Sequence, residues 1–304
     1  MSRLRAWLAL ARLSNAPTVA TNAFVGFAIG ASAVPHPEES DPAELLPVWM
    51  PFALALGVMM IYAAGMILND WFDRQVDAVE RPRRPIPSGA IPPRQALLAG
   101  AALLLAGCGT LIAITPHALP WALLLAAAVV AYDALHATPA AGIPLMALCR
   151  MLAVVVPAVC TAPPGAMPLP LLLWFALPLG AYIAVLSLLA RKEVGPTGVT
   201  WPALLLPFAA LMPLGALALR LIPPVTHPSI YFVGGLIGAL IAWHLRAWMP
   251  PRRDRLVLAV MGWIAAIPLA DATGLLVMGQ PALALIAVGC FFATAVGHTR
   301  IAGS

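Results

Sequence analysis

Charge is scarce in this sequence. Only 10% of its 304 residues are charged and 62% are hydrophobic, whereas a soluble globular domain carries about 25% charged residues. A soluble domain is therefore excluded. Strands of alternating apolar and polar residues are also absent, which excludes a membrane barrel. Apolar windows of roughly 20 residues recur instead, and each is long enough to cross a bilayer as a helix. The composition predicts an all-α, polytopic membrane helical bundle.

Paired cysteines are lacking as well. Each of the four cysteines lies within an apolar stretch, and their spacing is typical of neither a disulfide framework nor a metal site. We interpret them as small buried residues.

Basic runs interleaved with aromatic residues, which a nucleic-acid site needs, are absent too. The net charge of +5 has another explanation, because Lys and Arg gather on the cytoplasmic side of membrane proteins. With the N-terminus inside, fifteen of the seventeen Lys and Arg fall on that side. We therefore expect an integral membrane protein with a cytoplasmic N-terminus. One Lys against sixteen Arg favours a GC-rich bacterial genome, and hence the bacterial inner (plasma) membrane.

We read residues 1–304 as a single integral-membrane domain with ten candidate spans. The last two are separated only by "MGQPA", so a bundle of about nine helices with a broken or re-entrant element is the alternative. The candidate spans cover residues 17–34, 45–68, 95–115, 119–136, 142–160, 169–190, 202–222, 229–248, 256–277 and 281–299.

The charges that are present concentrate after the second span, in a cytoplasmic loop over residues 69–94 that begins "NDWFDRQVDAVERPRRPIPSG". If the helix runs on beyond the membrane, Asp70, Asp73 and Asp77 fall within a sector of about 60° on one face. Three crowded carboxylates repel one another unless a cation lies among them. Mg²⁺ prefers such oxygens and usually bridges to substrate phosphate. The spacing therefore predicts a Mg²⁺ site.

Arginines follow these aspartates at once. Arg81 and Arg84 carry guanidinium groups, which match phosphate oxygens bidentately. Arginines at a cytoplasmic helix end are also ordinary topology anchors. Acidic residues contribute little to topology, however, so anchoring does not explain the aspartates. Metal-binding carboxylates beside arginines at the mouth of an apolar bundle predict a site for a lipid diphosphate.

The same stretch resembles the first aspartate-rich motif of the UbiA superfamily of intramembrane prenyltransferases, N-D-x-x-D-x-x-x-D followed by R-P-x-x-S-G. The resemblance implies a bundle of about nine helices that holds a prenyl diphosphate through Mg²⁺. It further implies that the allylic C–O bond ionises and that an acceptor attacks the resulting cation. Asn69 and the three aspartates would then form the metal end, while Arg81, Arg84 and Ser88 would face the diphosphate.

The family's second aspartate motif, expected after the sixth span, is missing. No aspartate occurs between Asp133 and Asp254, and that region reads "AYIAVLSLLARKEVGPTG". We expect Glu193, flanked by Arg191 and Lys192, to supply a weakened second half. A charged loop that only anchors a helix is the alternative.

A second polar patch ends the fourth span and opens the fifth. Family members place a tyrosine and a basic residue here, and Tyr132 and His136 take these places. Arg150 lies inside the fifth span, where an ionisable group suggests function. It would pair with Asp133 or reach the diphosphate. Asn22 is either a diphosphate contact or an interhelical hydrogen bond. The patch most resembles the EboC-like branch of the superfamily, which fixes no substrate.

The sequence thus predicts an enzyme that transfers a polyprenyl group to a small acceptor, aromatic or otherwise nucleophilic, in contact with membrane lipid. The alternative is a protein of the same fold that binds or transports prenyl lipid without catalysis. The sequence determines neither the acceptor, nor the prenyl chain length, nor the oligomeric state. The predicted catalytic residues are Asp70, Asp73, Arg81, Arg84 and Glu193, the predicted metal ligands are Asp70, Asp73 and Asp77, and the predicted substrate contacts are Asn69, Asn22, Arg81, Arg84, Ser88, Tyr132, His136, Arg150, Arg191 and Lys192.

Overall fold

The computed structural model describes residues 2–34, 46–192, 235–239, 241, 243 and 253–300. The regular elements of these residues are all helices. The elements, in chain order, are α1 (Arg3–Leu10), the 3-10 turn η1 (Leu13–Asn15), α2 (Ala16–Ala31), α3 (Met50–Phe72), α4 (Arg74–Glu80), α5 (Pro93–Ile114), the 3-10 turn η3 (Pro116–Ala118), α6 (Leu119–Leu135), α7 (Pro139–Thr161), α8 (Leu169–Lys192), α11 (Arg253–Val277) and α12 (Pro281–Arg300).

Prolines mark where many of the long helices begin. A proline lies in the first turn of α2, α3, α5, α6 and α7. This position suits proline because its fixed φ is already helical and its missing N–H would have no partner there. Apolar side chains then continue each helix far enough to cross a bilayer. In the described part of the chain, seven helices have the length and hydropathy of membrane spans.

The predicted all-α membrane bundle is confirmed. The last two predicted spans are separate helices, α11 and α12, joined by a short turn at residues 278–280. The predicted span at 202–222 lies outside the described residues, as does most of the span at 229–248. The choice between nine and ten helices therefore stays a prediction.

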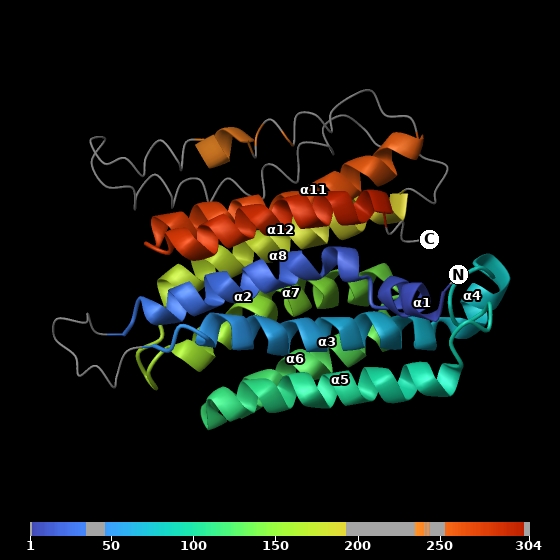
Figure 1. The fold of residues 1–304 in the computed structure, drawn as a ribbon, viewed down its shortest axis with the longest axis horizontal. Helices are drawn as coiled ribbons and strands as arrows, with labels where there is room; N and C mark the ends of the chain where they lie inside the picture. Colours follow the sequence, from blue (N-terminus) through green and yellow to red (C-terminus); the bar gives the residue numbers. More distant parts are fainter. Residues whose placement is uncertain are drawn as a thin grey trace.

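The helix α2 occupies the middle of the bundle (Figure 1). It packs against α3 and α7 on one side and against α11 and α12 on the other. Two glycines allow the closest of these contacts, because a Cβ at Gly26 would lie 2.2 Å from the Val154 carbonyl oxygen, and one at Gly30 would lie 2.6 Å from that of Ala158. Such small-residue pairs let membrane helices approach closely. The α2 and α7 backbones thus meet directly.

A small apolar cluster holds the end of the bundle where α1 and α4 lie (Figure 1). Leu10 of α1, Ile67 of α3, and Ile86 and Ile91 of the loop after α4 are buried together. This contact fixes the arginine-bearing loop and the N-terminal segment against the end of α3. It therefore places Arg84 and Arg12 beside the aspartates of that helix end.

Candidate active site

A cavity of about 640 Å³ opens among α2, α3, α6, α7, α8 and α11. Its charged wall includes Arg12, Asp73, Arg84, His136 and Arg191, which all lie near helix ends or in the turns beyond them. Its remaining wall is mostly apolar. The apolar lining includes Val19, Val58, Ile61, Leu125, Val129, Ile183, Leu186, Val260 and Ile264. The cavity can therefore hold a molecule with a charged head and an apolar body.

Helical periodicity brings the site residues of α3 and α6 to this cavity. The cavity-lining residues of α3 recur at spacings of three and four along one helical face, ending at Asn69 and Asp73. Those of α6 follow the same rule and end at Asp133 and His136. Each helix thus presents an apolar stripe that becomes polar at the same end of the bundle.

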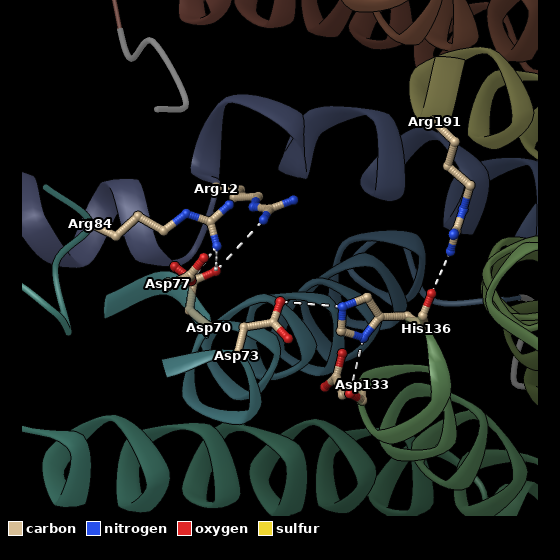
Figure 2. A network of polar contacts seen from close by, with 8 residues as sticks. All are labelled: Arg12, Asp70, Asp73, Asp77, Arg84, Asp133, His136 and Arg191. Carbon is tan, nitrogen blue, oxygen red and sulfur yellow. Dashed lines mark hydrogen bonds and ion pairs between the residues drawn. The ribbon is translucent and has the colours of Figure 1, made fainter. Parts of the chain in front are cut away.

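The aspartates do not lie on one uninterrupted helix. The long helix α3 ends at Phe72, and the shorter α4 starts after Asp73, which caps both elements. Asp70 and Asp77 turn toward Arg84, whereas Asp73 turns into the cavity toward His136 (Figure 2). Hydrogen bonds of helical spacing still cross this single turn residue, from the Asp73 N–H to the Asn69 carbonyl oxygen and from the Asp77 N–H to the Asp73 carbonyl oxygen, so the helical path runs on beyond Phe72 as expected. The three side chains do not share one direction, because Asp73 turns away from the other two (Figure 2).

Arg84 joins Asp70 and Asp77 directly. Its Nη1 lies 2.6 Å from Asp77 Oδ2 and 3.3 Å from Asp70 Oδ1, and the Arg84 side chain is buried. A second guanidinium, that of Arg12, reaches Asp70 Oδ1 at 3.6 Å. Arg12 has a left-handed backbone, with φ 43°, at the turn between α1 and η1. The two arginines thus lie where the carboxylates and the cavity meet (Figure 2).

His136 lies between Asp73 and the end of α8. Its Nε2 is 3.2 Å from Asp73 Oδ2, and its Nδ1 is 3.1 Å from the Asp133 carbonyl oxygen. Both partners are acceptors, so both contacts are hydrogen bonds only when the ring carries two protons. Arg191 donates to the His136 carbonyl oxygen. These contacts join α3, α6 and α8 at the charged end of the cavity, which is its mouth.

Two buried side chains at the cavity wall have polar atoms without a hydrogen-bond partner. Both carboxylate oxygens of Asp133 and the Nδ2 of Asn69 are buried and unpaired. Asp133 is 2% exposed and Asn69 is 6% exposed. The Asn69 amide is a weak hydrogen-bond donor to the Asp133 carboxylate and falls short of normal hydrogen-bond geometry. Unpaired buried polar groups are rare and each calls for an explanation.

A separate polar network lies within the bundle. The Asp271 Oδ2 of α11 accepts hydrogen bonds from Thr21 at 2.6 Å and from Asn22 at 2.8 Å. Arg150 of α7 donates to Asn22 at 3.2 Å and to Thr18 at 3.0 Å. Arg150 therefore joins Asp271 through α2. It makes no hydrogen bond to Asp133, whose oxygens are unpaired, so the predicted Arg150–Asp133 pair is absent.

The structure gathers most of the predicted site residues and separates a few. The predicted residues that line the cavity are Asn69, Asp73, Asp77, Arg81, Arg84, Tyr132, His136, Arg150 and Arg191. Asp70 lies behind them and reaches the cavity through Arg84. Asn22 belongs to the polar network with Arg150. Ser88 is exposed and donates to the Pro85 carbonyl oxygen, away from the cavity lining. Glu193 and the side chain of Lys192 lie outside the described residues.

Three charged residues of interest were not among the predicted site residues. Arg12 has the sequence signal of a topology anchor, and only the turn before α2 brings it to Asp70. Asp133 and Asp271 each had a usable signal, since an aspartate within an apolar stretch is costly and suggests function or a partner. Asp271 has its partners in α2, and Asp133 has none.

Solved structures share the fold. The chain superimposes with a TM-score of 0.57 and 17% identity, over 93% of its length and 100% of the other chain, on a structure concerned with digeranylgeranylglyceryl phosphate synthase in membranes. It superimposes with a TM-score of 0.52 and 17% identity, over 96% of its length and 99% of the other chain, on a UbiA homologue from Archaeoglobus fulgidus bound to GPP and Mg²⁺.

Sequence relatives match over shorter stretches. The chain is 44% identical over 93 residues to a digeranylgeranylglyceryl phosphate synthase of Methanothrix thermoacetophila, which is 30% of this chain and 35% of that protein. It is 55% identical over 42 residues to the chloroplastic chlorophyll synthase of Oryza sativa subsp. japonica, 14% of this chain and 11% of that protein. The chain thus matches about a third of the first relative's length. The profile of the UbiA prenyltransferase family matches residues 19–256, and the chain belongs to that family.

Proposed function

We propose that this protein transfers a polyprenyl group from a prenyl diphosphate to a small nucleophilic acceptor, with Mg²⁺ as cofactor. The observation that carries the proposal is the cavity itself, with a mouth of arginines and carboxylates above an apolar wall. Family membership supports the reaction class. The structural neighbour bound to GPP and Mg²⁺ supports the ligand class.

The residues present fit a divalent cation that is completed by substrate. Within the described residues, no three His, Cys, Asp or Glu side chains are grouped closely enough to hold a metal alone. Mg²⁺, however, is usually held by one or two carboxylates together with substrate phosphates and waters. Asp73 faces the cavity, and the unpaired oxygens of Asp133 lie on the opposite helix. When bound, the ion would neutralise the charge that develops on the diphosphate.

The side chains of the mouth would position the diphosphate. Arg81 and Arg191 line the cavity with exposed side chains and can meet phosphate oxygens bidentately. Arg84 is instead committed to Asp70 and Asp77, so it holds these carboxylates in place and lends positive charge to the mouth. Charge placed in advance where the leaving group forms is the main source of rate in such sites.

The apolar wall would hold the prenyl chain and exclude water. The allylic C–O bond breaks and its electron pair leaves with the diphosphate. The acceptor nucleophile then forms a bond to the allylic carbon and releases its proton. Tyr62 and Tyr132 line the cavity, and aromatic faces stabilise a nearby cation. Water that reached the cation would yield an alcohol, so the apolar lining protects the product.

The acceptor is left to experiment, because the named relatives differ in product. One group of relatives is named for digeranylgeranylglyceryl phosphate and another for chlorophyll. An acceptor that carries a glycerol phosphate is one class to supply. A small aromatic acceptor is the other. We also propose that the chain forms a single domain and that the mouth of the cavity faces the cytoplasm.

Turnover in membranes that carry the full chain tests the proposal. Labelled farnesyl or geranylgeranyl diphosphate, Mg²⁺, a host lipid extract and both acceptor classes are supplied, and diphosphate release and new labelled lipid are followed. We expect metal-dependent product that falls about 10³-fold in Asp73→Ala, a loss of the size caused by removing transition-state charge stabilisation. Arg83→Gln is the matched control, since Arg83 is exposed and does not line the cavity.

Two results would contradict the proposal. Saturable binding of the diphosphate without product, in every acceptor mixture, would favour a carrier. Equal turnover in Asp73→Ala and Arg83→Gln membranes, at equal protein level, would show that the residues at the cavity mouth take no part in the reaction.

A further inference from the structure

The carboxylates at the cavity mouth differ in how they are neutralised. Asp70 and Asp77 pair with Arg84, and Asp73 contacts His136. Asp133 is the exception among them. Its side chain is buried, lines the cavity, and makes no ion pair and no hydrogen bond of normal geometry.

Burial makes this arrangement costly whichever form Asp133 takes. An ionised carboxylate removed from water needs a cation or several donors. A protonated carboxyl needs an acceptor for its O–H, and neither carboxylate oxygen of Asp133 makes a hydrogen bond of normal geometry. The position is nevertheless set by the fold, because Asp133 continues the same cavity-lining face of α6 as Val129. The fold thus places the Asp133 carboxylate at the cavity wall without an ion pair or a hydrogen bond of normal geometry.

The surroundings identify the kind of partner that is absent. Asp133 interacts electrostatically with the acidic Asp73 and Asp70 and with one cation, Arg12, which forms its ion pair with Asp70 instead. The nearby unpaired Asn69 amide adds polarity without charge. Figure 2 shows Asp133 and Asp73 on different helices with His136 between them at the mouth. Both helices thus place a carboxylate at the polar end of the cavity, and small hard cations prefer such oxygen ligands.

We propose that Asp133 is a ligand of the divalent cation, so that α6 supplies the carboxylate that the family's missing second aspartate motif would otherwise give. The inference rests on the proposed function. It differs from the predicted metal end in that the cation is held between α3 and α6, with Asp73 on one side and Asp133 on the other. The substrate diphosphate completes the coordination.

Binding of Mn²⁺ reports on this assignment without turnover. The purified full chain in nanodiscs is titrated with Mn²⁺ in the presence of an inert farnesyl thiodiphosphate, and free Mn²⁺ is followed by its electron paramagnetic resonance signal. We expect Asp133→Asn to weaken Mn²⁺ binding about tenfold or more, since even outer partners of a metal site are worth 10–100-fold in affinity. Asp271→Asn is the matched control, because Asp271 is also a buried intramembrane carboxylate but has its donors in α2.

Asp73→Ala separates failure of the inference from failure of the proposed function. Wild-type affinity in Asp133→Asn, with weak binding in Asp73→Ala, would overturn the inference and leave the proposed function standing. Mn²⁺ binding that is absent in the wild type, or unchanged in Asp73→Ala, would overturn both. Equal weakening in Asp133→Asn and Asp271→Asn would show a general packing effect and would overturn the inference.

A second variant covers the case in which Asp133→Asn does not fold. Thiolate ligands prefer soft metals over Mn²⁺, so Asp133→Cys should lose Mn²⁺ and bind Cd²⁺ at least tenfold more tightly than the wild type does. The four native cysteines are present in both proteins and serve as the background. No gain in Cd²⁺ affinity would count against a ligand at this position.

Discussion

The bundle contains two buried polar regions that are built in opposite ways. Around Asp271 the polar groups satisfy one another, because Thr21 and Asn22 donate to the carboxylate and Arg150 donates to Asn22. At the cavity mouth, Asp133 and Asn69 have unpaired buried atoms. The first region is satisfied by contacts within the protein, whereas the second retains buried polar atoms without a hydrogen bond.

This difference distinguishes polar groups that fix helix packing from polar groups that are available to a ligand. A satisfied intramembrane network fixes how helices pack, and here it joins α2, α7 and α11 at the place where Gly26 brings α2 against α7. Unsatisfied buried groups are rare because they cost stability, and a bound ion is one explanation for them. The ionisable residues of the spans therefore should not all be read as site residues. Arg150 lines the cavity, but its donated hydrogen bonds belong to the packing network.

Among changes that test this comparison, the largest effect is expected at the cavity mouth, with the polar network around Asp271 left intact. Arg84→Gln removes the guanidinium shared by Asp70 and Asp77, so these carboxylates repel each other and the mouth loses positive charge. We expect turnover to fall about 10²-fold, measured as labelled lipid formed per folded protein. Arg83→Gln should stay within twofold of the wild type. Equal loss in the two variants would mean that general charge, rather than this contact, matters.

A smaller effect is expected when the polar network around Asp271 is disrupted. Asp271→Ala leaves the Asn22 amide without its acceptor and removes the negative charge that Arg150 reaches through Asn22. We expect a destabilisation of about 1–3 kcal/mol, the cost of leaving buried partners unsatisfied. The midpoint of thermal unfolding in detergent measures it. Turnover per folded protein should change little, and a selective loss of turnover would place Asp271 in the reaction.

The smallest effect on stability is expected for Asp133→Asn. Asp133→Asn removes a buried carboxylate that makes no hydrogen bond, so metal-free protein should lose no stability, because no hydrogen bond is broken. Thermal unfolding in the presence of a chelator, beside Asp271→Ala, provides the test. A loss as large as that of Asp271→Ala would show that Asp133 has a structural partner, and the contrast between the two regions would fail.

Much of the fold follows from the sequence because the bilayer allows few solutions. Apolar runs long enough to span must form helices, and α3, α5, α6, α7, α8 and α12 begin or end close to the residues predicted for them. The charged loop was equally visible, since its three aspartates stand out in a chain with 10% charged residues. Local spacing did not predict the single turn residue, Asp73, between α3 and α4. It also did not predict that the Asp73 carboxylate turns toward His136.

The sequence by itself determined the helical class, the membrane setting and the identity of the charged loop, because these depend on composition and on spacing within one helix. Only the tertiary structure decided which charges meet. Arg12 reaches Asp70 from a different segment, Asp271 finds Thr21 at a separation of 250 residues, and Asp133 lies at the cavity wall without a partner. Such pairings depend on how the helices pack against one another, and no local pattern encodes that packing.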